Sequence, residues 1–126
     1  MGYTFDTTEH GGIFIARVGG DRHQHADQNF SEAWRFWSSV AVRMKERRLR
    51  RLLAVINVHA ALRTLNVPVF YRRLGEMGFT ADMRFALVYD MPPHARRVLE
   101  LGVQAAARDG WTIDHFESEA AALAWL

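Results

Sequence analysis

Histidines are the side chains of this sequence best suited to chemistry, and two of them lie close together. His23 and His25 are two positions apart in a polar segment that begins at Asp21. Two histidines at that spacing can share one face of an extended segment, as two ligands of zinc or another divalent ion would. The remaining ligands would have to come from His10, His59 or Asp21. Loop histidines are more commonly solvated, and we predict no metal and no other cofactor.

A second group of polar residues lies at or near the ends of the predicted strands. His59 and Thr64 come after the apolar run Leu52–Val58. Asp90 ends another apolar run, and Asp21 opens the segment after an earlier strand. Ligands of parallel α/β sheets bind outside the carboxyl ends of the strands, so these residues predict a ligand-binding or partner-binding site at that edge. A general acid or base at His59 would need a second group to orient it. The sequence identifies no such group, so a solvated or structural His59 is the simpler interpretation.

Other catalytic signatures are missing from the sequence. It contains no cysteine, which excludes thiol catalysis and is compatible with a bacterial-type cytoplasmic setting. Ser31, Ser38 and Ser39 fall within a predicted helix rather than in a nucleophile elbow. The segment "GGDRHQ" lacks the Gly-Lys-Ser/Thr ending of a phosphate-binding loop. We therefore predict a protein that is not an enzyme and rank a His59-centred enzyme last.

Basic residues are concentrated in one segment. The net charge is only +2, but "RMKERRLRR" at Arg43–Arg51 contains six basic residues and one acidic residue. One interpretation is the solvated end of a helix, where cations complement the dipole. The other is a patch for phosphate, nucleic acid or an acidic partner. No aromatic residues for base stacking are interleaved with the cluster, and we predict no nucleic-acid partner.

The elements that would position these residues alternate between strands and helices. Turn signals and apolar runs predict five strands, at Tyr3–Thr7, Ile13–Val18, Leu52–Val58, Met83–Asp90 and Trp111–Phe116. Helices are predicted from Phe30, from Asn66 to Gly78, over Met91–Gly110, and after Ser118. The order β-β-α-β-α-β-α-β-α indicates one α/β domain over residues 1–126, with a mostly parallel sheet and one antiparallel edge strand.

The first predicted helix carries most of the aromatic residues. Asn29 and Glu32 form a capping-box arrangement at its start. Its apolar residues recur at helical spacing and predict a buried face: Phe30, Ala33, Trp34, Trp37, Val40, Ala41 and Met44. Phe36 lies off the stripe of Trp34, Trp37 and Ala41 by helical angle. With Val40 it would form an exposed apolar patch, which predicts a homodimer through this helix.

Several stretches together resemble the STAS-like family, which contains the anti-sigma factor antagonists, or SpoIIAA-like proteins. "IARVGGD" resembles the family's second strand and turn, "LLAVINV" its central strand and "RFALVYD" the next strand. "IDHFESEAAALAWL" resembles the terminal strand and helix most closely. The resemblance implies that Leu123 and Leu126 pack over the sheet, and that Trp125 seals its edge or meets a neighbour.

The resemblance also implies a phosphorylated hydroxyl in the loop after the central strand, within an Asp-Ser-Ser-Gly type motif. This chain reads "VHAALRTLNVP" there, and Thr64 is the only hydroxyl near the position. No carboxylate or glycine flanks Thr64, so the alternative is that it bonds locally to the backbone of the turn. The departure favours a less characterised SpoIIAA-like bacterial group, in which a nonpolar ligand or a partner protein is suspected.

Two functions remain open. The first is a non-catalytic STAS-like regulatory or protein-interaction module in the cytoplasm. The alternative is a domain that binds a small apolar ligand or lipid between the sheet and the aromatic helices. A pocket lined by apolar groups would favour the second. No apolar run approaches the ~20 residues that a bilayer span requires.

Overall fold

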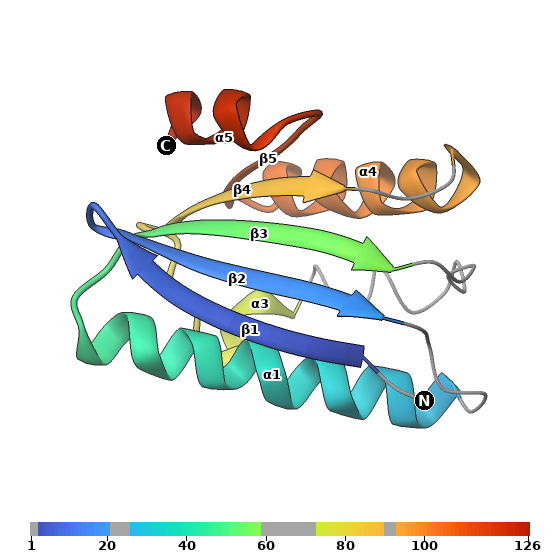
Figure 1. The fold of residues 1–126 in the computed structure, drawn as a ribbon, viewed down its shortest axis with the longest axis horizontal. Helices are drawn as coiled ribbons and strands as arrows, with labels where there is room; N and C mark the ends of the chain where they lie inside the picture. The colour runs from blue at the N-terminus through green and yellow to red at the C-terminus, as the bar shows by residue number, and fades with distance from the viewer. Residues whose placement is uncertain (1–2, 21–25, 59–72, 90–92) are drawn as a thin grey trace.

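The computed structural model describes residues 3–20, 26–58, 73–89 and 93–126 (Figure 1). These residues form a sheet of five strands with four helices. The strands are β1 (Tyr3–His10), β2 (Ile13–Gly20), β3 (Arg51–Val58), β4 (Arg84–Tyr89) and β5 (Thr112–Phe116). The helices are α1 (Ala26–Glu46), α3 (Leu74–Met77), α4 (Pro93–Arg108) and α5 (Glu119–Trp125).

The strands lie in the sheet in their order along the chain, β1-β2-β3-β4-β5. β1 pairs with β2 antiparallel, and each later neighbour pairs parallel. The prediction of an α/β fold with a mostly parallel sheet and one antiparallel edge strand is therefore confirmed. Parallel neighbours joined by right-handed crossovers that advance in one direction place their helices on one face of the sheet.

The antiparallel edge is a hairpin that is longer than the sequence predicted. Gly11 and Gly12 form its two-residue turn with φ of 60° and 79°, which fits a primed turn that matches the twist of the strands. Pairing runs from His10 opposite Ile13 to Tyr3 opposite Gly20. A tight turn lets the ladder start at once, so both strands extend beyond the predicted bounds.

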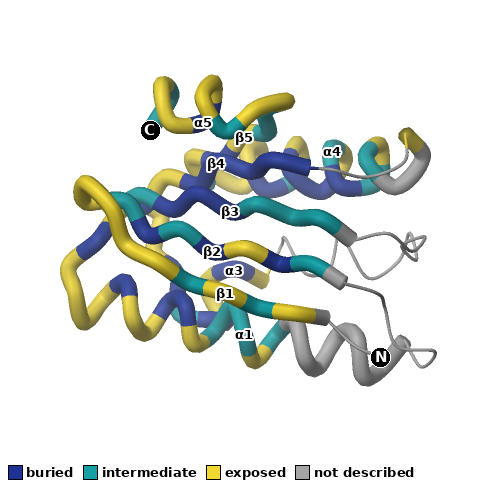
Figure 2. Tube along the Cα trace, viewed as in Figure 1, coloured by how far each residue is buried: buried dark blue, intermediate teal, exposed yellow. Residues whose placement is uncertain are grey.

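The core lies on both faces of the sheet but is larger on one. α1, α3 and α4 pack on one face, where Met44, Leu52 and Leu74 belong to the main core cluster. α5 lies on the opposite face, where Ala122 packs with Leu53 in a smaller cluster. β3 is thus buried from both sides, as its continuous apolar run predicted, and Figure 2 shows the buried centre of the sheet at β3 and β4.

α1 begins earlier than predicted. The capping-box arrangement placed the cap at Asn29, but Asn29 and Glu32 both lie within the helix Ala26–Glu46. The residues from Ala26 to Asn29 include neither glycine nor proline. The helical backbone therefore continues toward the N-terminus past the predicted cap.

The exposed patch predicted on α1 is wrong. Val40 has no exposed surface, and the ring of Phe36 stacks on Phe5 of β1 with centroids 4.4 Å apart. Phe36 also meets Trp37 edge-on at 4.9 Å. β1 extends the sheet past β2, so it covers a wider arc of α1 than the helical stripe alone suggested. The basis for a homodimer through this face is thereby removed.

The ends of α3 and α4 follow the sequence signals. α3 ends at Gly78, whose φ of 113° is left-handed and whose N–H donates to Gly75 and Leu74 carbonyls. Gly110 follows α4 with φ of 99°. Leu99, Gly102 and Ala106 of α4 are buried on the sheet side of this helix. The predicted helix from Asn66 does not run unbroken to Gly78, because Arg73 is the N-cap of α3 and is not helical. Residues 66–72 lie outside the described residues.

α5 packs differently from the prediction. Ser118 caps it as expected, because its hydroxyl accepts a hydrogen bond from the Ala121 N–H at 3.1 Å. Leu123, however, is 42% exposed, and Ala122 is the residue buried on the sheet. A methyl side chain lets this short helix approach the strands closely, which turns Leu123 outward. Leu126 packs beside the cluster as predicted.

The side chain of Trp125 packs against residues of β4 and β5 in its own chain. Its ring lies 5.4 Å from that of Phe116, and the guanidinium group of Arg84 lies over it at 4.6 Å. Arg84 also donates to the carbonyl of Trp125 at 2.8 Å. Of the two predicted roles, the structure therefore places Trp125 against its own sheet. No helix among the described residues is long and apolar enough to cross a membrane.

Candidate functional site

The carboxyl ends of the parallel strands meet at one edge, as the sequence predicted. Gly20 pairs with Val58, Ile56 pairs with Tyr89, and Val88 pairs with Phe116. We call this border of the sheet the carboxyl edge. The predicted site residues Asp21, His59 and Asp90 directly follow strand ends in the sequence, and Thr64 comes a few residues after His59. All four lie outside the described residues. Phe36, the fifth, is packed beneath β1.

The histidines considered as metal ligands, for which no metal was predicted, lie apart or outside the described residues. His23 and His25 lie outside it. His10 ends β1 beside the hairpin turn, opposite Ile13, which is the border of the sheet away from the carboxyl edge. Within residues 3–20, 26–58, 73–89 and 93–126 there is no group of three or more His, Asp or Glu side chains that could hold a metal ion.

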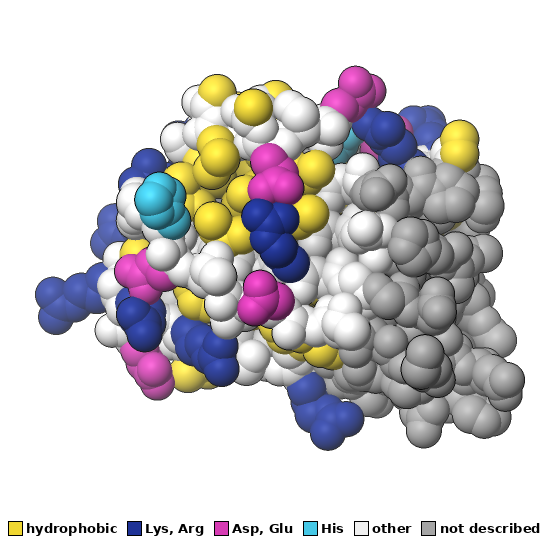
Figure 3. Space-filling model, viewed as in Figure 1, with side chains coloured by type: hydrophobic (Ala, Val, Ile, Leu, Met, Phe, Trp, Pro, Cys, Tyr) yellow, Lys and Arg dark blue, Asp and Glu magenta, His cyan; other side chains and the backbone are white. Residues whose placement is uncertain are grey.

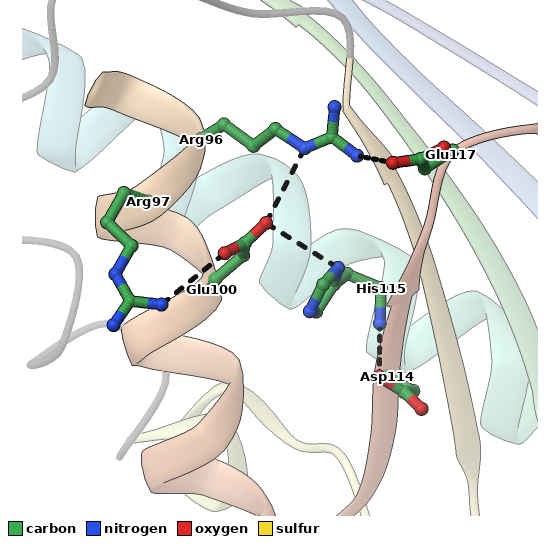
Figure 4. A network of polar contacts seen from close by, with 6 residues as sticks. All are labelled: Arg96, Arg97, Glu100, Asp114, His115 and Glu117. Carbon is green, nitrogen blue, oxygen red and sulfur yellow. Dashed lines mark hydrogen bonds and ion pairs between the residues drawn. The ribbon is translucent and has the colours of Figure 1, made fainter. Parts of the chain in front are cut away.

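A cluster of charged side chains does lie near the carboxyl edge, between α4 and the end of β5 (Figure 4). Glu100 of α4 is its centre. Its carboxylate lies 3.5 Å from Nε of Arg96, 3.7 Å from a terminal nitrogen of Arg97 and 3.9 Å from Nδ1 of His115. Arg96 also donates to Glu117 at 3.2 Å. We call Arg96, Arg97, Glu100, His115 and Glu117 the carboxyl-edge cluster.

Local structure explains how these side chains converge. Arg96 and Arg97 precede Glu100 by four and three residues on α4, the spacing at which helical side chains are neighbours. His115 lies two positions after Ile113, which is buried against α4, so strand alternation turns His115 to the same face. Glu117 follows the last residue of β5 and reaches back to Arg96.

The ring of His115 is held by an aromatic neighbour on the next strand. Tyr89, the last residue of β4, stacks on His115 with centroids 6.1 Å apart and an interplanar angle of 15°. Tyr89 is buried with the main core. The backbone N–H of His115 donates to the carboxylate of Asp114 at 2.8 Å. The imidazole is therefore packed on one side by a core aromatic ring and on another by the Glu100 carboxylate.

The Glu100 carboxylate has three charged or titratable neighbours, but among the described residues it accepts no short hydrogen bond from them. Its side chain is only 20% exposed, yet its contacts with Arg96, Arg97 and His115 span 3.5 to 3.9 Å, longer than a normal hydrogen bond. Among the described residues, Glu100 makes no shorter hydrogen bond. A half-buried carboxylate with lone pairs still available can accept hydrogen bonds from an incoming donor.

A second ion pair lies on the opposite face of the sheet. Arg17 of β2 donates to both carboxylate oxygens of Glu119, at 3.1 and 2.8 Å. These hydrogen bonds lower the pKa of Glu119 and raise the pKa of Arg17, to which the charge of Asp6 also contributes. The pair ties the first turn of α5 to the central part of the sheet. Its bidentate geometry indicates a structural link rather than an open site.

Comparison with known proteins adds no family to this description. No model of a known protein family matches the chain, and no curated protein matches it.

Sequence reasoning missed the carboxyl-edge cluster. The one signal available was the spacing of Arg96, Arg97 and Glu100 on a predicted helix. His115 was treated only as a strand residue, because nothing in a single sequence indicates that α4 packs beside β5. Sequence reasoning did identify where the carboxyl ends of the parallel strands meet, since strand ends are predictable from apolar runs.

Proposed function

We propose that this protein is a non-catalytic STAS-like module that binds a protein partner in a regulatory role. The observation that carries the proposal is the half-buried carboxyl-edge cluster, because open α/β sheets bind their ligands at this edge. The mainly parallel sheet with one antiparallel edge strand supports the STAS-like resemblance at the level of architecture. Asp21, His59, Thr64 and Asp90 would contribute from the adjoining segments.

The distribution of exposure in the cluster favours protein recognition. Glu117 and Arg97 are 87% and 63% exposed, while Glu100 is largely covered. Charges at the rim of an interface steer association and fix its register, and covered polar groups near the centre penalise a wrong partner. A partner that supplies a hydrogen-bond donor to Glu100 would complete a carboxylate that the described residues leave unsaturated.

Position-specific photo-crosslinking tests this proposal. A photoreactive amino acid replaces Arg97, near the start of α4, or Arg108, at its other end. Both positions are exposed and both lose one positive charge. In cells of the native host, we expect the residue-97 variant to form a discrete protein adduct that the residue-108 variant does not form. Equal adducts at both positions, or none at residue 97, would contradict docking at the carboxyl edge.

Glu100→Gln, introduced into the residue-97 crosslinking variant, tests whether the Glu100 charge contributes to partner binding. The amide keeps the size of the side chain but removes its charge, and with it the preference for a cationic or strongly donating partner group. In the residue-97 crosslinking background, Glu100→Gln should reduce the adduct several-fold. Gln104→Glu, one turn further along α4 and exposed, is the control that should leave the adduct unchanged.

A second candidate function is the binding of a small apolar ligand or lipid. It is favoured by aromatic and aliphatic side chains that pack at the margin of the main core without being fully covered, namely Trp34, Trp37 and Ile56. Native mass spectrometry of protein purified from its own host distinguishes the two candidates. A retained small molecule of constant mass would favour the second, and a bare chain that crosslinks at residue 97 would favour the first.

A further inference from the structure

Basic side chains gather at the border of the sheet opposite the carboxyl edge. They come from the end of α1, the turn after it and the starts of β3 and β4. Figure 3 shows Lys and Arg side chains at this end of the molecule, where α1 ends and the hairpin turns. We call this set the basic corner: Lys45, Arg47, Arg48, Arg50, Arg51 and Arg84.

Four of these arginines already contact acceptors of the chain itself. Arg47 donates to Glu9 at 2.8 Å, and Arg50 lies 3.3 Å from Asp82. Arg51 donates to the carbonyl of Gly11, and Arg84 donates to that of Trp125. The acceptors are therefore carboxylates and peptide carbonyls. Within the described part of the chain, Lys45 and Arg48 have no polar side-chain contact.

Arg48 occupies a backbone conformation that normally selects glycine. Its φ is 56°, in the left-handed region. The end of α1 is closed there by hydrogen bonds from the Arg48 N–H to the Lys45 carbonyl and from the Leu49 N–H to the Met44 carbonyl. A Cβ disfavours this conformation, and the same position after a helix is most often glycine.

The chain itself provides the comparison. Left-handed residues also follow α3 and α4, and there they are Gly78 and Gly110. At the basic corner the chain has an arginine instead, exposed and without a partner among the described residues. Residues in sparsely populated backbone conformations cluster at functional sites. Arg48 therefore marks the basic corner as a candidate binding surface.

We propose that the basic corner binds an acidic segment of a partner protein, with Arg48 and Lys45 as its first contacts. The carboxylates and carbonyls that Arg47, Arg50 and Arg51 already meet are the two acceptor types that an acidic peptide supplies. These arginines can exchange an internal acceptor for an external one of the same kind. This surface is separate from the carboxyl-edge cluster and does not depend on the function proposed there.

The number of available cations favours an acidic peptide over nucleic acid. Strongly salt-dependent binding to a phosphate backbone is typical of proteins that make roughly 6 to 10 phosphate contacts. The basic corner has two cations without an internal partner among the described residues and four that would first have to give up an internal acceptor, and Glu9, Glu46 and Asp82 lie among them. A short segment with a few carboxylates matches that number better than a continuous polyanion.

The test uses a fluorescein-labelled 12-residue peptide of alternating Glu and Ser, titrated against the full chain at about 50 and 150 mM salt. We expect binding that weakens with salt and is absent for the same peptide with Gln in place of Glu. Arg48→Gly and Lys45→Gln should each weaken binding about tenfold, the cost of one charge-assisted contact.

Arg48→Gly also separates recognition from folding. Glycine relieves the left-handed backbone, so its thermal midpoint should equal or exceed that of the wild type while its binding falls. Arg35→Ala removes the same charge from an exposed position on α1, about 20 Å away along the helix, and should stay within twofold of the wild type. Unchanged binding in Arg48→Gly, or an equal loss in Arg35→Ala, would overturn the proposal. Tighter binding of a 12-nucleotide single strand than of the Glu peptide would overturn it in favour of nucleic acid.

Discussion

At the scale of single residues, the Arg17–Glu119 pair makes the stability of the fold depend on pH, and the direction of that dependence follows from the pKa of Glu119. The hydrogen bonds from Arg17 hold the pKa of Glu119 below its ordinary 4.5. A carboxyl group with a depressed folded-state pKa contributes stability above that ordinary value, and the contribution is lost as the pH falls through the folded-state pKa. The pair is thus expected to matter at neutral pH and to disappear in acid.

We therefore predict that Glu119→Gln lowers the free energy of unfolding at pH 7. The difference should close as the pH falls below the ordinary 4.5 and through the lower folded-state pKa of Glu119. Both side chains are 44% exposed, so solvent screening limits the loss at pH 7 to at most about 1 kcal/mol. Urea denaturation at several pH values measures it. In an Arg17→Gln background the same substitution should show almost no pH-dependent difference. A gap that persisted in acid would assign the effect to something other than this ion pair.

Residue-level signals were readable where they act locally. Ser118 and the glycines Gly78 and Gly110 were identified because a cap or a left-handed turn needs only its own neighbours. Arg48 could not be identified in this way, since an arginine carries no sequence sign of left-handed backbone. His115 and Glu100 could not be paired, because their contact depends on how α4 and β5 pack.

At the scale of elements, Phe36 joins α1 to the edge strand. Phe36→Glu would place a carboxylate between Phe5 and Trp37, so we predict a loss of about 3 kcal/mol in the free energy of unfolding. Chemical denaturation followed by tryptophan fluorescence measures this loss. Val42→Glu is the matched control, because Val42 is on the same helix and is 51% exposed; it should change stability by less than about 0.5 kcal/mol.

The docking of α5 gives a second prediction at this scale. Trp125→Ala removes the contacts with Phe116 and the Arg84 guanidinium, which should cost about 2 kcal/mol and detach the helix locally. Hydrogen exchange should accelerate in α5 and at the end of β5 but not in α4. Leu123→Ala, at an outward position of the same helix, should leave exchange nearly unchanged. Uniform acceleration across the sheet would show instead that α5 is part of the global unfolding unit.

Elements were predicted better than their packing. The apolar run of β3 and the alternation of β5 sufficed to place both strands in a parallel sheet. The buried side of α5 was assigned to Leu123 rather than Ala122, because a small residue gives no hydrophobic signal of close approach. The buried surface of α1 was underestimated, because the contact between Phe36 and β1 depends on tertiary packing that the helical spacing does not show.

At the scale of the whole molecule, one sheet is shared by the cores on both of its faces. Leu53 and Leu52 are neighbours in β3 and belong to different core clusters, so loss of β3 removes side chains from both cores at once. We predict a single cooperative transition for the chain. Far-UV circular dichroism and tryptophan fluorescence should give coincident urea curves. Separated midpoints would contradict the interpretation of residues 1–126 as one domain.

The overall architecture followed from the order of the elements, whereas the function did not. Strand and helix alternation fixes a layered sheet on general grounds. The residues that follow the strand ends at the carboxyl edge, including His59 and Thr64, lie outside the described part of the chain, so their predicted roles stay predictions.

The two outermost strands of the described sheet, β1 and β5, also bear on how the protein behaves at high concentration. The outer side of an edge strand has unpaired backbone groups to which a strand of another chain can add. Charged side chains on the edge strand discourage this addition. β1 is eight residues long and carries Asp6 and Glu9, while β5 has five residues. Figure 2 shows β1 as largely exposed. Neutralising Asp6 and Glu9 together would leave a long, threonine-rich template, and fibril formation rather than loss of fold would be its first consequence.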